Sequence, residues 1–82
     1  MINRIKDILS KYDETSYVIY NTTQGGIIVI QIKVRLAQVI FECFKNELCL
    51  INGFDNEYRT INCGCHLDDL DKYVDEFYSF NF

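Results

Sequence analysis

The chain has 82 residues, of which 49% are hydrophobic and 15% aromatic, with a net charge of −4 and no proline. This length fits a single domain over residues 1–82, and the hydrophobic content excludes a disordered chain. The acidic balance argues against direct nucleic-acid binding, which normally requires a basic stripe on the protein.

The first predicted element is a helix over residues 2–12. Its apolar residues recur at spacings of three and four, which places them on one helical face. This face comprises Ile2, Ile5, Ile8, Leu9 and Tyr12. Arg4, Lys6 and Lys11 fall outside it, so we expect these bases to be solvated.

Two strands joined by a glycine turn follow the helix. Residues 17–20 are β-branched or aromatic, and residues 28–36 alternate between an aliphatic face and a face that becomes polar. The segment between them ends in Gly25 and Gly26, which is a strong turn signal. The pattern therefore predicts a β-hairpin.

Residues 36–46 are compatible with two structures. Their apolar positions match a helical face, but the residues are β-branched or aromatic and have neither a capping residue nor a glycine stop. We therefore favour a strand, a tight turn at Lys45 and Asn46, and a further strand over residues 47–51. No turn residue separates this region from the preceding strand, so one long strand with a bulge near Ala37 is an alternative.

The last third of the chain begins with a predicted turn over residues 52–56, because Asn-Gly is typical of tight hairpin turns. A short strand over residues 58–62 and a closing helix over about residues 67–79 follow. The apolar stripe of that helix comprises Leu67, Leu70, Val74, Phe77 and Tyr78. The aromatic tail, residues 80–82, either returns to the core or exposes two rings.

These elements predict an α+β fold. Strands that are neighbours in sequence and joined by short turns favour an antiparallel meander, here of about four or five strands. One apolar face of such a sheet needs a cover, which the N-terminal and C-terminal helices supply. The expected architecture is a two-layer sandwich.

A candidate metal site is formed by Cys63, Cys65 and His66, because zinc prefers thiolate and imidazole ligands. The spacing disfavours it, since structural zinc sites use cysteines two to four residues apart and only one residue separates these. We expect buried thiols and no bound metal or cofactor. His66 precedes a predicted helix, and we expect it to act there as an imperfect N-cap.

Catalytic activity is not expected from this sequence. No nucleophile, base and orienting group occur in a recognisable pattern, and a chain of this size offers little volume for a pocket. We therefore predict a protein that is not an enzyme.

The charge is divided unevenly along the chain. Residues 42–82 carry nine acids against three bases, whereas residues 1–41 carry five bases against three acids. The predicted last helix places Asp68, Asp71 and Asp75 on one side, and Asp69 and Glu76 beside Lys72 on another. Some of this acidity stabilises the helix N-terminus.

The acids that lie beyond the first turn of this helix, together with the aromatic residues near them, predict a docking surface, because aromatic anchors among charges are typical of protein interfaces. The expected partner-binding residues are Asp68, Asp71, Tyr73, Asp75, Glu76, Tyr78, Phe80 and Phe82.

In size, charge and order of elements the whole chain resembles the small acidic anti-CRISPR proteins of phages. The resemblance rests on no motif, so it transfers no functional residue. Several of these anti-CRISPR proteins are DNA mimics. The resemblance implies a non-enzymatic inhibitor that docks an acidic surface on a basic site of a protein such as a CRISPR effector nuclease.

Three alternatives remain open from the sequence: a zinc-stabilised regulatory domain using Cys63, Cys65 and His66, a homodimeric module using the sheet edge or the aromatic tail, and an immunity protein. The N-terminal residues show no apolar stretch typical of a signal peptide, and the longest aliphatic run, residues 27–30, is too short to span a bilayer. We expect a monomer or homodimer in the cytoplasm, of the host cell if a phage encodes it, without contact to membranes.

Overall fold

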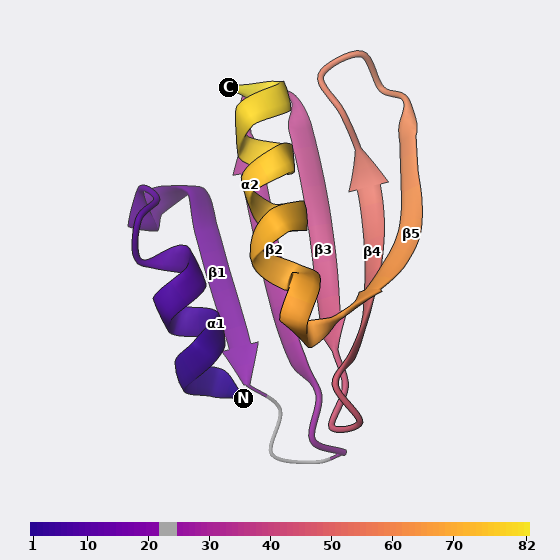
Figure 1. Cartoon of the computed structure of the whole chain (residues 1–82). Helices are drawn as coiled ribbons and strands as arrows, with labels where there is room; N and C mark the ends of the chain where they lie inside the picture. Colours follow the sequence, from indigo (N-terminus) through magenta and orange to yellow (C-terminus); the bar gives the residue numbers. More distant parts are fainter. Residues whose placement is uncertain (22–24) are drawn as a thin grey trace.

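Figure 1 shows a computed structural model of the chain, which describes residues 1–21 and 25–82. The N-terminal helix α1 (Ile2–Leu9) and a 3₁₀ turn, η1 (Glu14–Ser16), precede the sheet, and a second 3₁₀ turn, η2 (Leu67–Asp69), leads into the C-terminal helix α2 (Leu70–Asn81). The five strands are β1 (Tyr17–Asn21), β2 (Ile28–Val34), β3 (Ala37–Cys43), β4 (Leu48–Phe54) and β5 (Thr60–His66). None of the described helices has the length and apolar character needed to cross a membrane.

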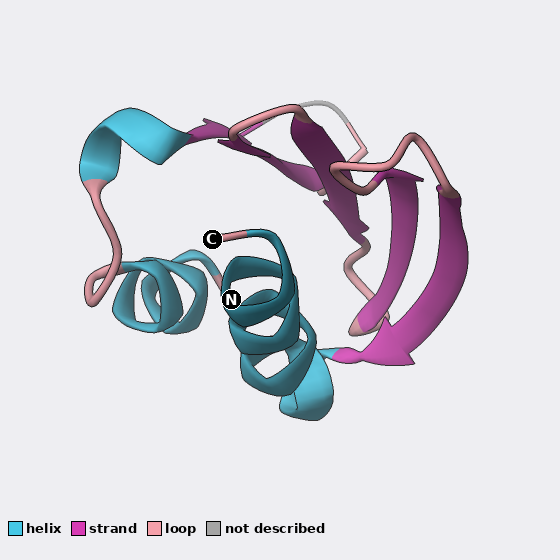
Figure 2. Ribbon diagram, turned by 90° about the horizontal axis from the view of Figure 1, so that it is seen from above, coloured by secondary structure: helices cyan, strands magenta, loops and turns pink. Residues whose placement is uncertain are grey.

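The strands form one antiparallel sheet in the order β1-β2-β3-β4-β5, so each strand pairs with its neighbour in sequence. Both helices lie side by side on the same face of the sheet, which curves around them (Figure 2). The predicted α+β meander with two covering helices is therefore confirmed, as is the strand over the ambiguous residues 36–46. The turn predicted between the first two strands, which ends in Gly25 and Gly26, falls partly outside the described residues.

The hydrophobic core lies between the helices and the inner face of the sheet. Alternate residues of β2 and β3 point inward and are almost completely buried, including Ile30, Ile32 and Phe41. The helices contribute their own apolar stripes to the same cluster, through Ile5, Leu9, Leu70, Val74 and Phe77. Burial of one such side chain contributes about 1.5–3 kcal/mol, so the core accounts for most of the driving force of folding.

The turn between β2 and β3 has no sequence signal, and the proposed bulge near Ala37 is wrong. Val34 pairs directly with Ala37, which leaves Arg35 and Leu36 as a two-residue turn, with Arg35 at a φ of 57°. The side chain of Asn56 supports this turn, because its Oδ1 accepts hydrogen bonds from the backbone N–H groups of Leu36 (3.0 Å) and Ala37 (2.9 Å). A residue 20 positions away thus compensates for the missing turn glycine.

The turn predicted over residues 52–56 is also wrong, because β4 continues to Phe54. Gly53 pairs with Val39 within the ladder, and a Cβ atom at Gly53 would lie 2.0 Å from the carbonyl oxygen of Gln38. The glycine is therefore required for close approach of two strands, not for a turn. The true turn begins at Asp55, and β5 is displaced to Thr60–His66.

Asp55 organises the β4–β5 turn. Its Oδ1 accepts hydrogen bonds from the backbone N–H groups of Glu57 and Arg59, both at 2.9 Å, and its Oδ2 accepts one from Arg59 Nε at 2.9 Å. Burial opposes ionisation of this carboxyl, but the hydrogen bonds outweigh it and hold the pKa of Asp55 below its ordinary value.

A pH-dependent contribution to stability follows from this lowered pKa. The contribution is complete above about pH 4, the ordinary pKa of an unfolded Asp, and is lost as the pH falls toward the lowered pKa, because the unfolded chain then takes up the proton first. Asp55→Asn should therefore lower the melting temperature most at neutral pH and progressively less below about pH 4. Asp7→Asn is the matched control, since Asp7 is exposed and its side chain has no described partner. A melting-temperature difference for Asp55→Asn that stays constant down to about pH 2.5 would contradict the assignment.

Candidate binding surface

The acids of η2 and α2 lie on two sides of the helix, as the helical spacing predicts, and the structure shows which residues each side faces. Asp68, Asp71 and Asp75 lie on the side toward α1, where Arg4 donates a hydrogen bond to Asp68 Oδ1 at 2.7 Å. This hydrogen bond lowers the pKa of Asp68 below its ordinary value. The basic N-terminal helix therefore compensates part of the acidic C-terminal helix within the chain.

Asp75 also interacts with the N-terminal part of the chain. It accepts a hydrogen bond from Tyr12 Oη at 2.7 Å and lies 3.9 Å from Lys11 Nζ. The Tyr12 ring stacks on Tyr78 with 3.9 Å between ring centroids and 4° between the planes. Burial, reinforced by the hydrogen bond to Asp75, raises the pKa of Tyr12.

Tyr78 is not part of the exposed surface. Its side chain is 7% exposed, and its Oη lies 2.6 Å from Ser16 Oγ. Tyr73 is half-buried against the core. Two of the four aromatic residues expected at the docking surface, Tyr73 and Tyr78, thus serve mainly to attach α2 to the rest of the fold.

The remaining acids and aromatics are exposed, the acids on two sides of the helix: Asp71 on the side toward α1, and Asp69 and Glu76 on the side toward β5. Asp69, Asp71 and Glu76 are exposed, and no ion pair within the described part of the chain involves them. Phe80 and Phe82 are 69% and 87% exposed, whereas Asn81 between them is buried. We call these five residues, Asp69, Asp71, Glu76, Phe80 and Phe82, the α2 surface.

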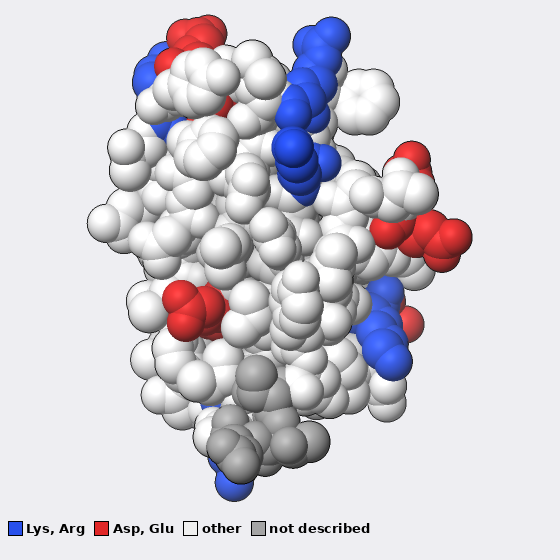
Figure 3. Space-filling model, turned by 180° about the vertical axis from the view of Figure 1, so that it is seen from behind, with Lys and Arg blue, Asp and Glu red and all other residues white. Residues whose placement is uncertain are grey.

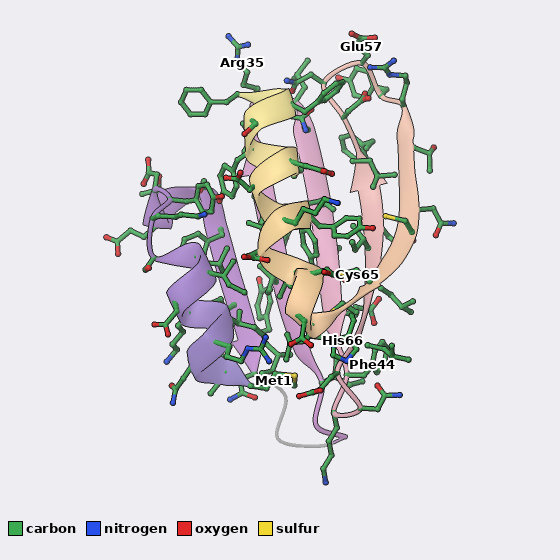
Figure 4. The ribbon with its side chains drawn as sticks, viewed as in Figure 1. Met1, Arg35, Phe44, Glu57, Cys65 and His66 are labelled. Carbon is green, nitrogen blue, oxygen red and sulfur yellow. The ribbon has the colours of Figure 1, made fainter. Side chains whose placement is uncertain are left out.

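His66 caps the helical segment, as the sequence predicted. Its Nδ1 accepts a hydrogen bond from the backbone N–H of Asp68 at 3.1 Å. Figure 4 shows Cys65 and His66 at the end of β5, next to the start of α2. Cys63 and Cys65 point to the inner side of the sheet and His66 to the outer side, because successive strand residues alternate.

Three of the four cysteines instead form a continuous row across the inner face. Cys43 and Cys49 are opposite each other on β3 and β4, with 3.3 Å between their sulfur atoms, and Cys65 is opposite Cys49 on β5. Burial raises the pKa of Cys65 to about 12. Cys63, two residues away, is exposed, so the expectation of a buried thiol is wrong at this cysteine. Within the described residues, no three His, Cys, Asp or Glu side chains form a group that could hold a metal ion.

A groove of about 640 Å³ lies between α2 and the inner face of β3–β5. Its lining is mainly apolar and includes Phe41, Ile61, Tyr73 and Phe80, while Glu76 also contributes to it. The expectation that the chain lacks volume for a pocket is therefore wrong. No sequence signal pointed to this groove, because it arises where α2 leaves the last strands of the curved sheet incompletely covered.

Comparison of the chain with protein-family models, with curated proteins and with solved structures finds no match.

Proposed function

We propose that this chain is a non-enzymatic protein-binding inhibitor that docks its α2 surface on a basic, nucleic-acid-binding site of another protein. The observation that carries the proposal is the set of three exposed carboxylates without ion pairs among the described residues, followed by two exposed phenylalanine rings. Carboxylates spaced along a helix can take the place of backbone phosphates on a basic protein surface.

The arrangement supports a division of roles within the surface. Exposed charges accelerate association with an oppositely charged partner and make it sensitive to salt, but contribute little affinity once screened. Exposed aromatic rings contribute the buried area that holds a complex together. We therefore assign steering to Asp69, Asp71 and Glu76, and anchoring to Phe80 and Phe82.

The layout that the chain shares with anti-CRISPR proteins supports a phage or mobile-element origin and a CRISPR effector nuclease as the partner. The proposal narrows the expected docking set. Asp68 and Asp75 stabilise the contact between the two helices, and Tyr78 stacks within it. These three residues are structural, and their replacement should lower stability before it lowers binding.

A DNA-cleavage assay with purified CRISPR effector nucleases tests this proposal. The wild-type chain should inhibit at least one nuclease in competition with DNA, and added salt should weaken the inhibition. The double variant Asp71→Lys/Glu76→Lys should bind at least about tenfold more weakly, because attraction becomes repulsion at two positions.

The matched control is Asp7→Lys/Glu14→Lys, which changes the net charge by the same amount at two exposed positions outside α2. The control should inhibit as well as the wild-type chain, and both variants should keep the circular dichroism spectrum of the wild type. Equal loss of inhibition in both variants would show that only net charge matters and would refute the assigned surface. Absence of inhibition across the nucleases would refute this class of partner.

A further inference from the structure

Among the described residues, no helix covers the outer face of the sheet, since α1 and α2 both lie on the inner face (Figure 2). Seen from this side, the molecule is largely uncharged across its centre (Figure 3). Four large apolar residues of the outer face are about half exposed. They are Val18 (49%), Tyr20 (50%), Leu48 (51%) and Leu50 (48%).

These apolar residues spread over β1 and β4, and Val29 and Ile40 on the central strands connect them, so they form one patch. Soluble monomers rarely expose a contiguous apolar patch larger than a few hundred Å². Five strands at a spacing of about 4.8 Å and seven residues at about 3.3 Å give a face of about 500 Å², in which these apolar side chains lie among polar ones such as Gln31 and Asn52. The outer face therefore has the mixed apolar and polar character of a small protein interface.

The charges on this face indicate what covers it. Among the outward positions of the described strands, only Lys33 and Glu42 carry a full charge at neutral pH. In the β2–β3 ladder, Lys33 pairs with Gln38 and Glu42 pairs with Val29. The pair Gln31–Ile40 lies midway between them. Lys33 on β2 and Glu42 on β3 thus lie on opposite sides of the Gln31–Ile40 pair, each two residues away from it along its own strand.

This placement is self-complementary. A two-fold axis that passes in front of Gln31 and Ile40, perpendicular to the strands, exchanges the two ends of the face. It brings Lys33 of each copy next to Glu42 of the other, offset by one strand spacing of about 4.8 Å across a sheet separation of about 10 Å. Lysine and glutamate side chains together span that distance.

We propose that the outer face binds a second copy of this chain, in a two-fold dimer with two Lys33–Glu42 ion pairs across an apolar interface. The turn residues Arg35 and Lys45 lie beyond the strand ends, and Arg35 points away from the sheet (Figure 4). The face is smaller than the roughly 800 Å² per partner of a standard interface. Interfaces below the standard size are typical of weak complexes, so we expect a dimer that dissociates at roughly low micromolar concentration and forms at high micromolar concentration.

Light scattering coupled to size-exclusion chromatography, over this concentration range, tests the proposal. Lys33→Glu alone and Glu42→Lys alone should each remain monomeric, because each places two pairs of like charges across the two-fold axis. An equimolar mixture of the two variants should form a heterodimer, since every pair is then opposite in sign. The double variant Lys33→Glu/Glu42→Lys should form a homodimer with wild-type affinity.

Three results would overturn the proposal: a monomeric wild-type chain at high micromolar concentration, single variants that dimerise as the wild type does, or a mixture that stays monomeric. Asp7→Lys serves as the control for net charge, because it lies on α1, on the opposite side of the sheet. The α2 surface remains free in such a dimer, so failure of the dimer and failure of the proposed inhibition are independent.

Discussion

Gly53→Ala is expected to abolish the folded state at room temperature or to leave it barely populated. The new methyl group would lie 2.0 Å from the carbonyl oxygen of Gln38 and 2.7 Å from the Cα atom of Val39. Both atoms belong to the backbone of β3, in the centre of the sheet, so no side-chain rotation relieves the overlap. Separating the two strands would break their ladder, at a cost above about 3 kcal/mol, the upper end for overpacked cores. Domains of this size have total stabilities of only about 5–10 kcal/mol.

Circular dichroism and thermal melting measure this effect, and Gly64→Ala provides the matched control. Gly64 also lies within a strand, but a Cβ atom there would meet its nearest atom, the carbonyl oxygen of Cys49, at 3.1 Å. Strand β5 is at the edge of the sheet and can shift by a few tenths of an ångström. We expect Gly64→Ala to fold. A Gly53→Ala protein that melts within a few degrees of Gly64→Ala would contradict the close approach.

Asn56→Ala is expected to destabilise the fold by about 2–3 kcal/mol, because one side chain joins two distant segments. Besides accepting from Leu36 and Ala37, it donates from Nδ2 to the backbone carbonyl of Asn81 at 2.7 Å. Its backbone N–H donates to Asn81 Oδ1 at 3.2 Å. Removal of the side chain leaves the N–H of Ala37, a fully buried residue, without this acceptor.

Chemical denaturation with a linear extrapolation gives the free energy of unfolding for this comparison. Asn62→Ala is the control, since Asn62 is exposed on β5 and its side chain makes no hydrogen bond within the described residues. Its replacement should change the free energy by less than about 0.5 kcal/mol. Equal effects of the two substitutions would show that the β2–β3 turn does not depend on Asn56.

The strands and helices could be predicted because their signals are local. The alternation from Ile28 to Val34 and the stripe from Leu70 to Tyr78 each lie within one element. The predicted turn at Lys45 and Asn46 is also confirmed, but two other turns could not be predicted in the same way. The Arg35–Leu36 turn depends on Asn56, which no short window of sequence connects to it, and Gly53 is a glycine required by a neighbouring strand. A glycine in a turn and a glycine at a close approach look alike in sequence.

The proposed binding surface also combines features that the local sequence predicts with contacts between residues far apart in the chain. The helical spacing predicts which acids share a side of α2, and the structure agrees. The ion pairs Arg4–Asp68 and Lys11–Asp75 form because α1 lies beside α2. Each pair joins residues more than 60 positions apart, so the local sequence does not predict it. For that reason we propose a docking surface narrower than the one that the sequence predicts, without the residues that α1 and its following turn contact.

The contact between α1 and α2 also has a consequence for synthesis of the chain. Helix α1 leaves the ribosome before the sheet does, whereas Asp68, Asp75 and Tyr78, which contact the N-terminal segment, leave after the sheet. The meander between them consists of neighbouring hairpins, which close quickly because their loops are short. The nascent sheet therefore forms while its inner face is still open, and the first helix completes its packing only when the last one has been made.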